Sequence, residues 1–493
     1  MVAVKQVQEG IAIMYMEFAL QKMISHPYVM PIHKLIAFRN SISIVMEYAP
    51  IGFQDIATGN YTFSQRLVAL HKILEGLRCI HQNGVIHCDI KPQNIQAIVN
   101  RSGNAVHQAT VGRSGNAVHQ ATVSRSENDN DITPLIIDFG LSFPVISTIT
   151  GRDIHEVRGT YDCLPPQMLM DPPSTLYTNK VDIWGFGMLA LILFTGHDIY
   201  PDGTYCNENR PACFSFIQNT MRQGSLLHHI LDIIRKHKLC PITASEEKLL
   251  AAFISSALSF KPEYRPSARR LLENPLFSHM TNHPEHPNLC KTLTPEWPPE
   301  KHISPKYMEK LRFGALEIAR LFLGFRVPIE GTDLFSTSGD IGLGIHIFYW
   351  TVDLMYLYFT HPTVDVNTMT DDIFGAYIVA FVSMMQSVDG FFLPSDLTDV
   401  FINLLSHVPA RGVITHEMIE AIKPGIAVTL DGRIWRRFLY ESIRTKKDLN
   451  KSYHILFNPE EYLSYKPNPI DPLNEESPAF WDTTSIMSIQ LPK

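Results

Sequence analysis

The sequence lacks a strong excess of charge, a paired set of cysteines and a secretory leader, and each absence excludes a class of protein. Of its 493 residues 18% are charged, and the net charge of −7 gives no basic surface for nucleic acid. Its seven cysteines are an odd number scattered along the chain, which predicts reduced thiols in an intracellular protein, cytoplasmic or nuclear. The first residues contain no basic segment followed by an apolar run, so we expect no signal peptide.

Apolar runs long enough to cross a membrane are also lacking. Residues 183–194 form an apolar run too short to span a bilayer, which indicates a helix buried within a large core. Residues 341–359 are longer but include His346 and Asp353, whose burial in lipid would be costly. The length and the 45% hydrophobic content therefore predict two or three soluble domains.

Residues 86–94 read Ile-His-Cys-Asp-Ile-Lys-Pro-Gln-Asn, and they resemble the catalytic loop of eukaryotic protein kinases. The resemblance implies that Asp89 orients a substrate hydroxyl and accepts its proton. It also implies that Lys91 places positive charge beside the transferred phosphoryl group and that Asn94 offers an oxygen to magnesium. For an isolated Asp, a surface turn would be the better interpretation. The loop departs from the family at Cys88, where most kinases have arginine.

The other parts of a nucleotide site are spread along the first third of the chain. Asp138-Phe139-Gly140 follows an apolar strand and resembles the kinase triplet whose aspartate binds the principal magnesium. Val-Ala-Val-Lys at residues 2–5 resembles the strand whose lysine, here Lys5, holds the ATP phosphates, and Glu17 resembles the helix glutamate that pairs with it. A solvated helix face is the alternative for Glu17. The glycine-rich hairpin that precedes this lysine in kinases is missing, so we expect an upstream start or weaker nucleotide binding.

Residues 42–49 alternate like a strand and resemble the segment that leads into the kinase hinge. The resemblance places Met46 behind the adenine and the backbone of Glu47 and Ala49 against the base edge, although plain core packing also accounts for Met46. Gln96 would lie under the adenine, where kinases usually have an apolar residue. Gln21 would lie against Phe139, where an apolar residue is again usual.

Residues 159–167 resemble the substrate-docking loop of kinases, but the usual terminal glutamate is Gln167. We expect Gln167 to accept a hydrogen bond from Arg265, the counterpart of the family's buried arginine. Lys91 together with Thr160 resembles the Ser/Thr kinases. Because Cys88 cannot pair with a phosphate, control by phosphorylation at Ser142, Ser147, Thr148 or Thr150 is not expected. The residues expected to support the site are His87, Phe139, Gly140, Thr160, Gln167, Asp182 and Arg265.

The predicted fold class is α+β, with a bilobal kinase-like domain over residues 1–280 and an all-helical domain after it. The truncated N-lobe would cover residues 1–48 and the C-lobe residues 49–280. Residues 101–112 recur almost unchanged as residues 113–124, and the segment 101–130 is interpreted as an insertion at a hairpin tip. Six prolines mark residues 281–305 as a linker. Residues 457–493 are also rich in proline and are expected to form an extended tail. Residues 306–456 show helical patterns at 307–325, 341–359, 371–388 and 394–405 that resemble a cyclin box. An unrelated helical domain is an equally good interpretation of these patterns.

The sequence thus predicts an intracellular protein kinase that uses ATP and Mg²⁺ to phosphorylate Ser or Thr of protein substrates. The alternative is a pseudokinase that acts as a binding scaffold, favoured by the missing hairpin and by Gln21 and Gln96. Neither nucleic acid nor a membrane is an expected partner. We also expect an intramolecular contact between the helical domain and the Glu17 helix.

Overall fold

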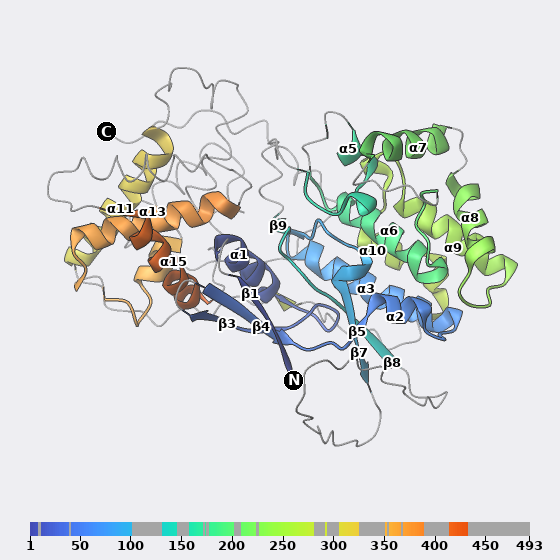
Figure 1. Cartoon of the computed structure of the whole chain (residues 1–493), viewed down its shortest axis with the longest axis horizontal. Helices are drawn as coiled ribbons and strands as arrows, with labels where there is room; N and C mark the ends of the chain where they lie inside the picture. The colour runs from blue at the N-terminus through green and yellow to red at the C-terminus, as the bar shows by residue number, and fades with distance from the viewer. Residues whose placement is uncertain are drawn as a thin grey trace.

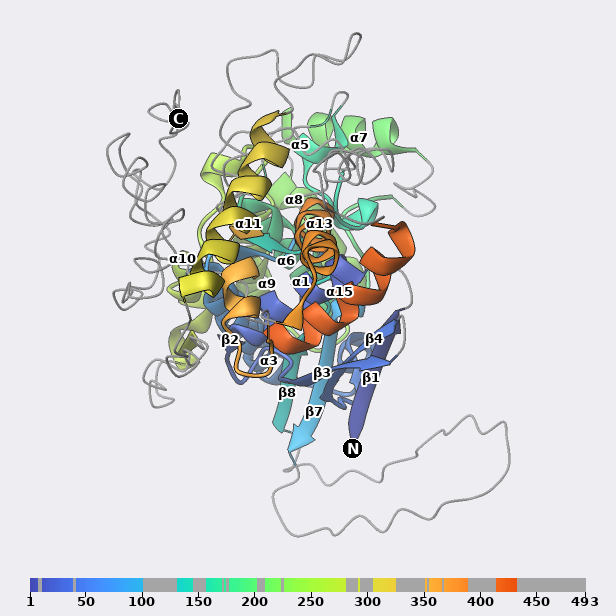
Figure 2. The same cartoon turned by 90° about the vertical axis from the view of Figure 1, so that its left-hand side faces the viewer.

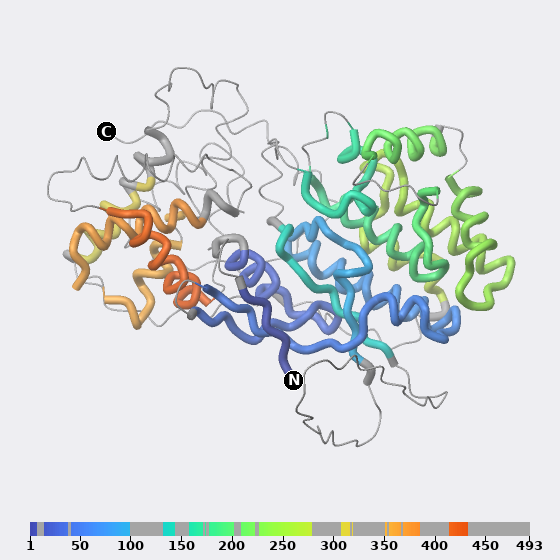
Figure 3. Tube along the Cα trace, in the orientation of Figure 1, coloured from blue at the N-terminus to red at the C-terminus, as the bar shows by residue number. Residues whose placement is uncertain are grey.

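The chain forms an N-terminal sheet between two groups of helices, as the computed structural model shows (Figures 1 and 3). The larger group follows the sheet in sequence, and the smaller group comes from the C-terminal part of the chain. The structure describes residues 1–7, 11–38, 41–100, 131–144, 157–170, 173, 177–201, 209–222, 226–280, 291–292, 305–324, 351–352, 354–365, 368–388 and 414–431.

The N-terminal sheet is antiparallel, with strand order β1–β4–β3. Its strands are β1 (Val2–Val7), β3 (Ile32–Phe38) and β4 (Ser41–Glu47), and α1 (Ile11–Lys22) packs against it. β4 is central because its β-branched residues Ile42 and Ile44 are fully buried while both of its edges are paired. The strand predicted at residues 2–5 and most of the one predicted at 42–49 are confirmed.

The first helices of the larger group lead directly to the predicted catalytic loop. After β5 (Ile51–Gly52) and α2 (Phe53–Thr58), Thr62 and Gln65 form the capping box that begins α3 (Phe63–Gln82). The Thr62 hydroxyl accepts from the Gln65 N–H at 3.3 Å, and the Gln65 side chain accepts from the Thr62 N–H at 2.9 Å. These bonds satisfy backbone donors that would otherwise be unpaired at the helix start.

A second small sheet lies beyond the loop, with strand order β5–β7–β8. β7 (Ile95–Asn100) and β8 (Asp131–Ile136) pair antiparallel, so the predicted hairpin is confirmed. β6 (Val85–Ile86) pairs with β9 (Phe143–Pro144). Residues 101–130 between β7 and β8 lie outside the described residues.

The helix α6 (Lys180–Thr195) is buried along nearly its whole length and forms the centre of the larger group. It confirms the buried helix predicted from residues 183–194. The helices around it and near it are α5 (Pro166–Leu169), α7 (Arg210–Arg222), α8 (Leu226–His237), α9 (Ala244–Ala257) and α10 (Ala268–Leu272). Among the described helices none is both long and apolar enough to cross a membrane.

The smaller group consists of α11 (Pro305–Gly324), helical residues at 351–352 and 354–359, α13 (Asp371–Val388) and α15 (His416–Leu430). Aromatic rings fill its core, and Phe359 stacks on Phe374 with centroids 5.1 Å apart. The helices predicted at 307–325 and 371–388 are confirmed. The helix predicted at 394–405 and the extended tail predicted at 457–493 lie outside the described residues. The resemblance to a cyclin box stays a prediction.

The cysteines differ from the expectation of reduced thiols. Cys79 and Cys213 are disulfide-bonded, whereas Cys88, Cys163 and Cys240 are free. Neither Cys79 nor Cys213 belongs to a cysteine spacing that indicates a disulfide from sequence alone. The scattered cysteine positions therefore did not predict these disulfides.

Candidate active site

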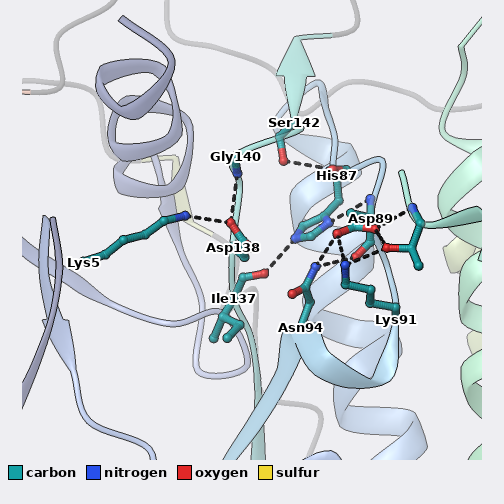
Figure 4. A network of polar contacts seen from close by, with 10 residues as sticks. Lys5, His87, Asp89, Lys91, Asn94, Ile137, Asp138, Gly140 and Ser142 are labelled. Atoms are coloured by element: carbon teal, nitrogen blue, oxygen red, sulfur yellow. Dashed lines mark hydrogen bonds and ion pairs between the residues drawn. The ribbon is translucent and has the colours of Figure 1, made fainter. Parts of the chain in front are cut away.

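Lys5, Glu17 and Asp138 meet in one ion-pair cluster between the N-terminal sheet and the second sheet. Figure 4 shows Lys5 and Asp138 of this cluster. The Lys5 Nζ lies 2.7 and 2.8 Å from the two Glu17 carboxylate oxygens and 2.9 Å from Asp138 Oδ1. β1 supplies the lysine, α1 the glutamate, and the segment after β8 the aspartate. Glu17 is 4% exposed, so the solvated helix face considered above for it is wrong.

Burial and charge act in opposite directions on these three groups. Burial raises the pKa of the Glu17 carboxyl, and the attraction of Lys5 offsets this only in part. Burial also opposes ionisation of Asp138, but the hydrogen bond and charge of Lys5 outweigh it and lower the pKa of Asp138. For Lys5, burial is outweighed by the two carboxylates, and its pKa is raised. The cluster therefore keeps Lys5 cationic and Asp138 ionised near neutral pH.

Asp89 lies at the centre of a second cluster, formed by the catalytic loop and the segment that contains Thr160. Lys91 Nζ lies 2.7 Å from Asp89 Oδ2 and donates to the Thr160 hydroxyl at 2.6 Å. The Thr160 hydroxyl donates to Asp89 Oδ1 at 2.8 Å, and the Thr160 N–H does so at 3.0 Å. Asn94 Nδ2 donates to the Asp89 carboxylate at 2.9 Å and to its backbone carbonyl at 2.8 Å. Asp89 is thereby fixed in a single orientation by three side chains.

The backbone of the catalytic loop is strained and is held by Asp182 of α6. Cys88 has φ +68° and Asp138 φ +65°, in the left-handed region that non-glycine residues rarely adopt. The Asp182 carboxylate accepts from the Cys88 N–H at 2.7 Å, the His87 N–H at 2.8 Å and His81 Nε2 at 2.9 Å. A buried carboxylate with three donors is what keeps the loop in this conformation.

His87 connects the catalytic loop to the Asp138 segment. Its ring packs edge-on against Phe139, and its Nε2 lies 3.0 Å from the Ile137 carbonyl, to which it donates. The Ser142 hydroxyl donates to the His87 carbonyl at 3.1 Å, and Ser142 is buried, so its hydroxyl has a structural contact. Burial lowers the pKa of His87, which keeps the ring neutral with Nδ1 as an acceptor.

The residues expected around the adenine come from the end of β4, from the residue that follows Tyr48 and from β7. Met46, Glu47 and Ala49 come at and after the end of β4, each half-buried, and Gln96 is half-buried in β7 beside Gly52 and Leu135. Their roles toward a base remain predictions.

Gln21 lies one helical turn after Glu17 and is 2% exposed. Its Nε2 donates to the Met30 carbonyl at 2.8 Å, while its Oε1 has no partner among the described residues. A buried carbonyl oxygen without a donor destabilises the fold. This is the physical consequence of a polar residue where the family has an apolar one.

Gln167 and Arg265 form the contact expected for them. Arg265 donates to Gln167 Oε1 at 2.8 Å and to the carbonyls of Ser259 and Lys180 at 2.8 and 3.0 Å. Arg265 lies over the ring of Trp184, 5.0 Å from its centroid. The guanidinium thus connects residues 159–167 to α6 and to residues 259–265.

Asn94 and Asp138 each keep a side-chain oxygen that could bind a magnesium ion. Because Asn94 Nδ2 is engaged by Asp89, its Oδ1 is turned to the Asp138 side (Figure 4). Both described hydrogen bonds to the Asp138 carboxylate, from Lys5 and the Gly140 N–H, fall on Oδ1. One amide oxygen and one carboxylate are hard ligands that leave places for water and phosphate oxygens, as magnesium prefers. The residues present therefore fit the ion.

Three residues that support the site were not singled out in the sequence. His81 contacts Asp182, Ser142 was considered only for phosphorylation, and Gly185 of α6 lies against the loop backbone. A Cβ on Gly185 would be 2.6 Å from the Ile90 carbonyl oxygen, so only glycine allows this approach. The string Trp-Gly-Phe-Gly was the available signal for Gly185; nothing in the sequence indicated the other two roles.

Comparison with known proteins agrees with this geometry. The family model of the protein kinase domain matches residues 1–277, and the chain belongs to that family. The chain is 26% identical over 255 residues to serine/threonine-protein kinase 17A of Oryctolagus cuniculus, covering 51% of each chain. It is 26% identical over 273 residues to serine/threonine-protein kinase cds1 of Schizosaccharomyces pombe, covering 54% of this chain and 48% of that protein. The chain thus spans about half the length of these relatives.

Proposed function

We propose that the protein transfers the γ-phosphoryl group of ATP to Ser or Thr hydroxyls of protein substrates. The observation that carries this proposal is the convergence of Lys5, Asp89, Asn94 and Asp138 from three separate segments into two adjacent clusters (Figure 4). Both relatives named above are serine/threonine-protein kinases, which supports the same class of reaction.

Asp89 is the group that meets the substrate hydroxyl. Its carboxylate is held by Asn94 and Thr160, so it can orient the hydroxyl and take its proton without first reorganising. Lys91, 2.7 Å away, keeps a positive charge where the phosphoryl group would pass. Its hydrogen bond to Thr160 closes the loop on the side where a protein substrate would lie.

Lys5 is the group that meets the ATP phosphates. Glu17 orients the ammonium through both carboxylate oxygens and compensates its charge in a half-buried place. Magnesium bound to Asp138 and Asn94 would neutralise charge on the phosphates during transfer.

A pseudokinase scaffold is the second candidate, and Gln21 favours it. The Oε1 of Gln21 is buried without a partner among the described residues, which destabilises α1, the helix that carries Glu17. Such a protein would bind nucleotide weakly and transfer no phosphate.

Radiolabelled phosphate transfer to a generic Ser/Thr protein substrate distinguishes the two. For the wild-type chain with MgATP we expect incorporation, and for Asp89→Asn a loss of about 10²- to 10⁴-fold, because general-base catalysis typically contributes this much. Asp232→Asn makes the same change at an exposed position of α8 and should leave the rate unchanged. Equal incorporation by wild type and Asp89→Asn would refute the mechanism, and none by either would favour the scaffold.

A further inference from the structure

The helix α1, which carries Glu17, is buried on every side. Eight consecutive residues, 14–21, are each 4% exposed or less, and they cover more than two turns. A helix at the surface of a domain normally has one apolar stripe and one solvated face. Both faces of α1 must therefore be covered, and by different parts of the chain.

The active-site cluster and the sheet cover one face. Glu17 and Gln21, one turn apart, lie on the same side of the helix, where Glu17 contacts Lys5 and Gln21 donates to the Met30 carbonyl. The sheet strands β3 and β4 pack against the same helix.

The C-terminal helices cover the opposite face. Tyr15, Ala19 and Lys22 follow one another at helical spacing on the side away from Glu17. Lys22 Nζ lies 2.8 Å from Asp431 Oδ2, directly after α15, which locates this face against the C-terminal helices. α13 and α15 both pack on α1, and α15 also packs on β3 (Figure 2).

A strand from the predicted linker fixes the end of α1 as well. β10 (Lys291–Thr292) pairs antiparallel with β2 (Ile24–Ser25), which begins just after α1 ends. The C-terminal part of the chain thus contacts the outer face of α1 through α13 and α15. It also contacts β3 through α15 and β2 through β10.

We propose that α13 and α15 hold α1 where Glu17 pairs with Lys5, so that the C-terminal helices set the affinity for MgATP and the catalytic rate within the same chain. The proposal rests on the proposed function. Moving Glu17 away from Lys5 requires α1 to rotate or shift, and either movement would expose apolar surface that α13 and α15 now bury.

Coupling of this kind is reciprocal, which gives a test on the unmodified full-length chain. If the C-terminal helices favour nucleotide binding, bound nucleotide must stabilise their contact with α1. We expect MgADP to slow hydrogen exchange at amides of α13 and α15, far from the nucleotide itself, and Asp138→Asn to abolish this protection. Protection of residues 131–144 by MgADP with unchanged exchange in α13 and α15 would overturn the proposal.

A substitution in the outer face of α1 provides a second test. Ala19→Glu puts a charge at a fully buried position of this face, and we expect it to weaken MgADP affinity by roughly 5- to 150-fold, the usual range of such coupling. Ala421→Glu makes the same change at an exposed position of α15 and should leave the affinity unchanged. A folded Ala19→Glu protein with wild-type affinity would overturn the proposal. Phosphate transfer without this coupling would refute only the role of the C-terminal helices, whereas wild-type protein that binds no MgADP would refute the kinase proposal too.

Discussion

Arg265 is a buried cation whose described hydrogen-bond partners are all uncharged oxygens. It is 1% exposed, and burial lowers the pKa of its guanidinium to about 9. Because the folded pKa lies below the unfolded one, the unfolded chain binds more protons between these two values. Burial of the charged guanidinium therefore lowers the free energy of unfolding fully below pH 9, and this destabilisation is relieved as the pH rises above 9.

Gln167→Glu would give Arg265 an ionic partner at a distance of 2.8 Å. We expect the free energy of unfolding at pH 7 to rise by about 1 to 2 kcal/mol, since hydrogen bonds between charged groups are stronger than neutral ones. The new carboxyl would have a lowered pKa in the folded protein, so the gain is present above its unfolded value of about 4.3 and is lost as the pH falls through the folded one. Urea unfolding at pH 7 and at low pH measures both. Gln54→Glu, exposed in α2, is the matched control, and an equal gain there would contradict this explanation.

At the scale of elements, the sequence predicted what local patterns determine. The β7–β8 hairpin and the buried α6 both follow from patterns of residues close together in the chain. The contacts that hold the catalytic loop were only partly predictable, because Asp182 meets His87 over a separation of 95 residues. The resemblance to kinases indicated that Asp182 and His87 support the site. Nothing in the sequence indicated that His81 and Ser142 do so.

Gly185 and Gly187 of α6 allow a test of how this helix positions the loop. Gly185→Ala would put a methyl group 2.6 Å from the Ile90 carbonyl oxygen, so the backbone between Asp89 and Lys91 must shift. We expect kcat to fall by about 10- to 100-fold, because small displacements of catalytic groups have effects of this size. Gly187→Ala instead meets Leu258 of the neighbouring segment at 2.8 Å and should lower stability with a much smaller change in kcat. Equal losses of kcat in the two folded variants would show that general destabilisation is the cause.

At the scale of the whole molecule, the sequence predicted the separate parts and a contact between the helical domain and the Glu17 helix, but not which helices make this contact. The helical character of α11 and α13 follows from their periodicity, yet the place of α13 against α1 depends on side chains that are distant in sequence. Ile11–Lys22 did carry one signal, since it is apolar on nearly all sides and a helix of this kind is normally buried.

Bound nucleotide should stabilise the whole chain because the site joins elements from β1, α1, the catalytic loop and the segment after β8. We expect MgADP at about 100 times its Kd to raise the free energy of unfolding by about 2.7 kcal/mol, as mass action requires for a ligand that binds only the folded state. Removing magnesium with a chelator should reduce this gain, and Asp138→Asn should make it independent of magnesium, since Asp138 is the carboxylate placed to hold the ion. Thermal unfolding monitored by circular dichroism, with Asp232→Asn as the control, measures each case. A gain of the same size with and without magnesium in the wild-type protein would show that Asp138 serves Lys5 alone.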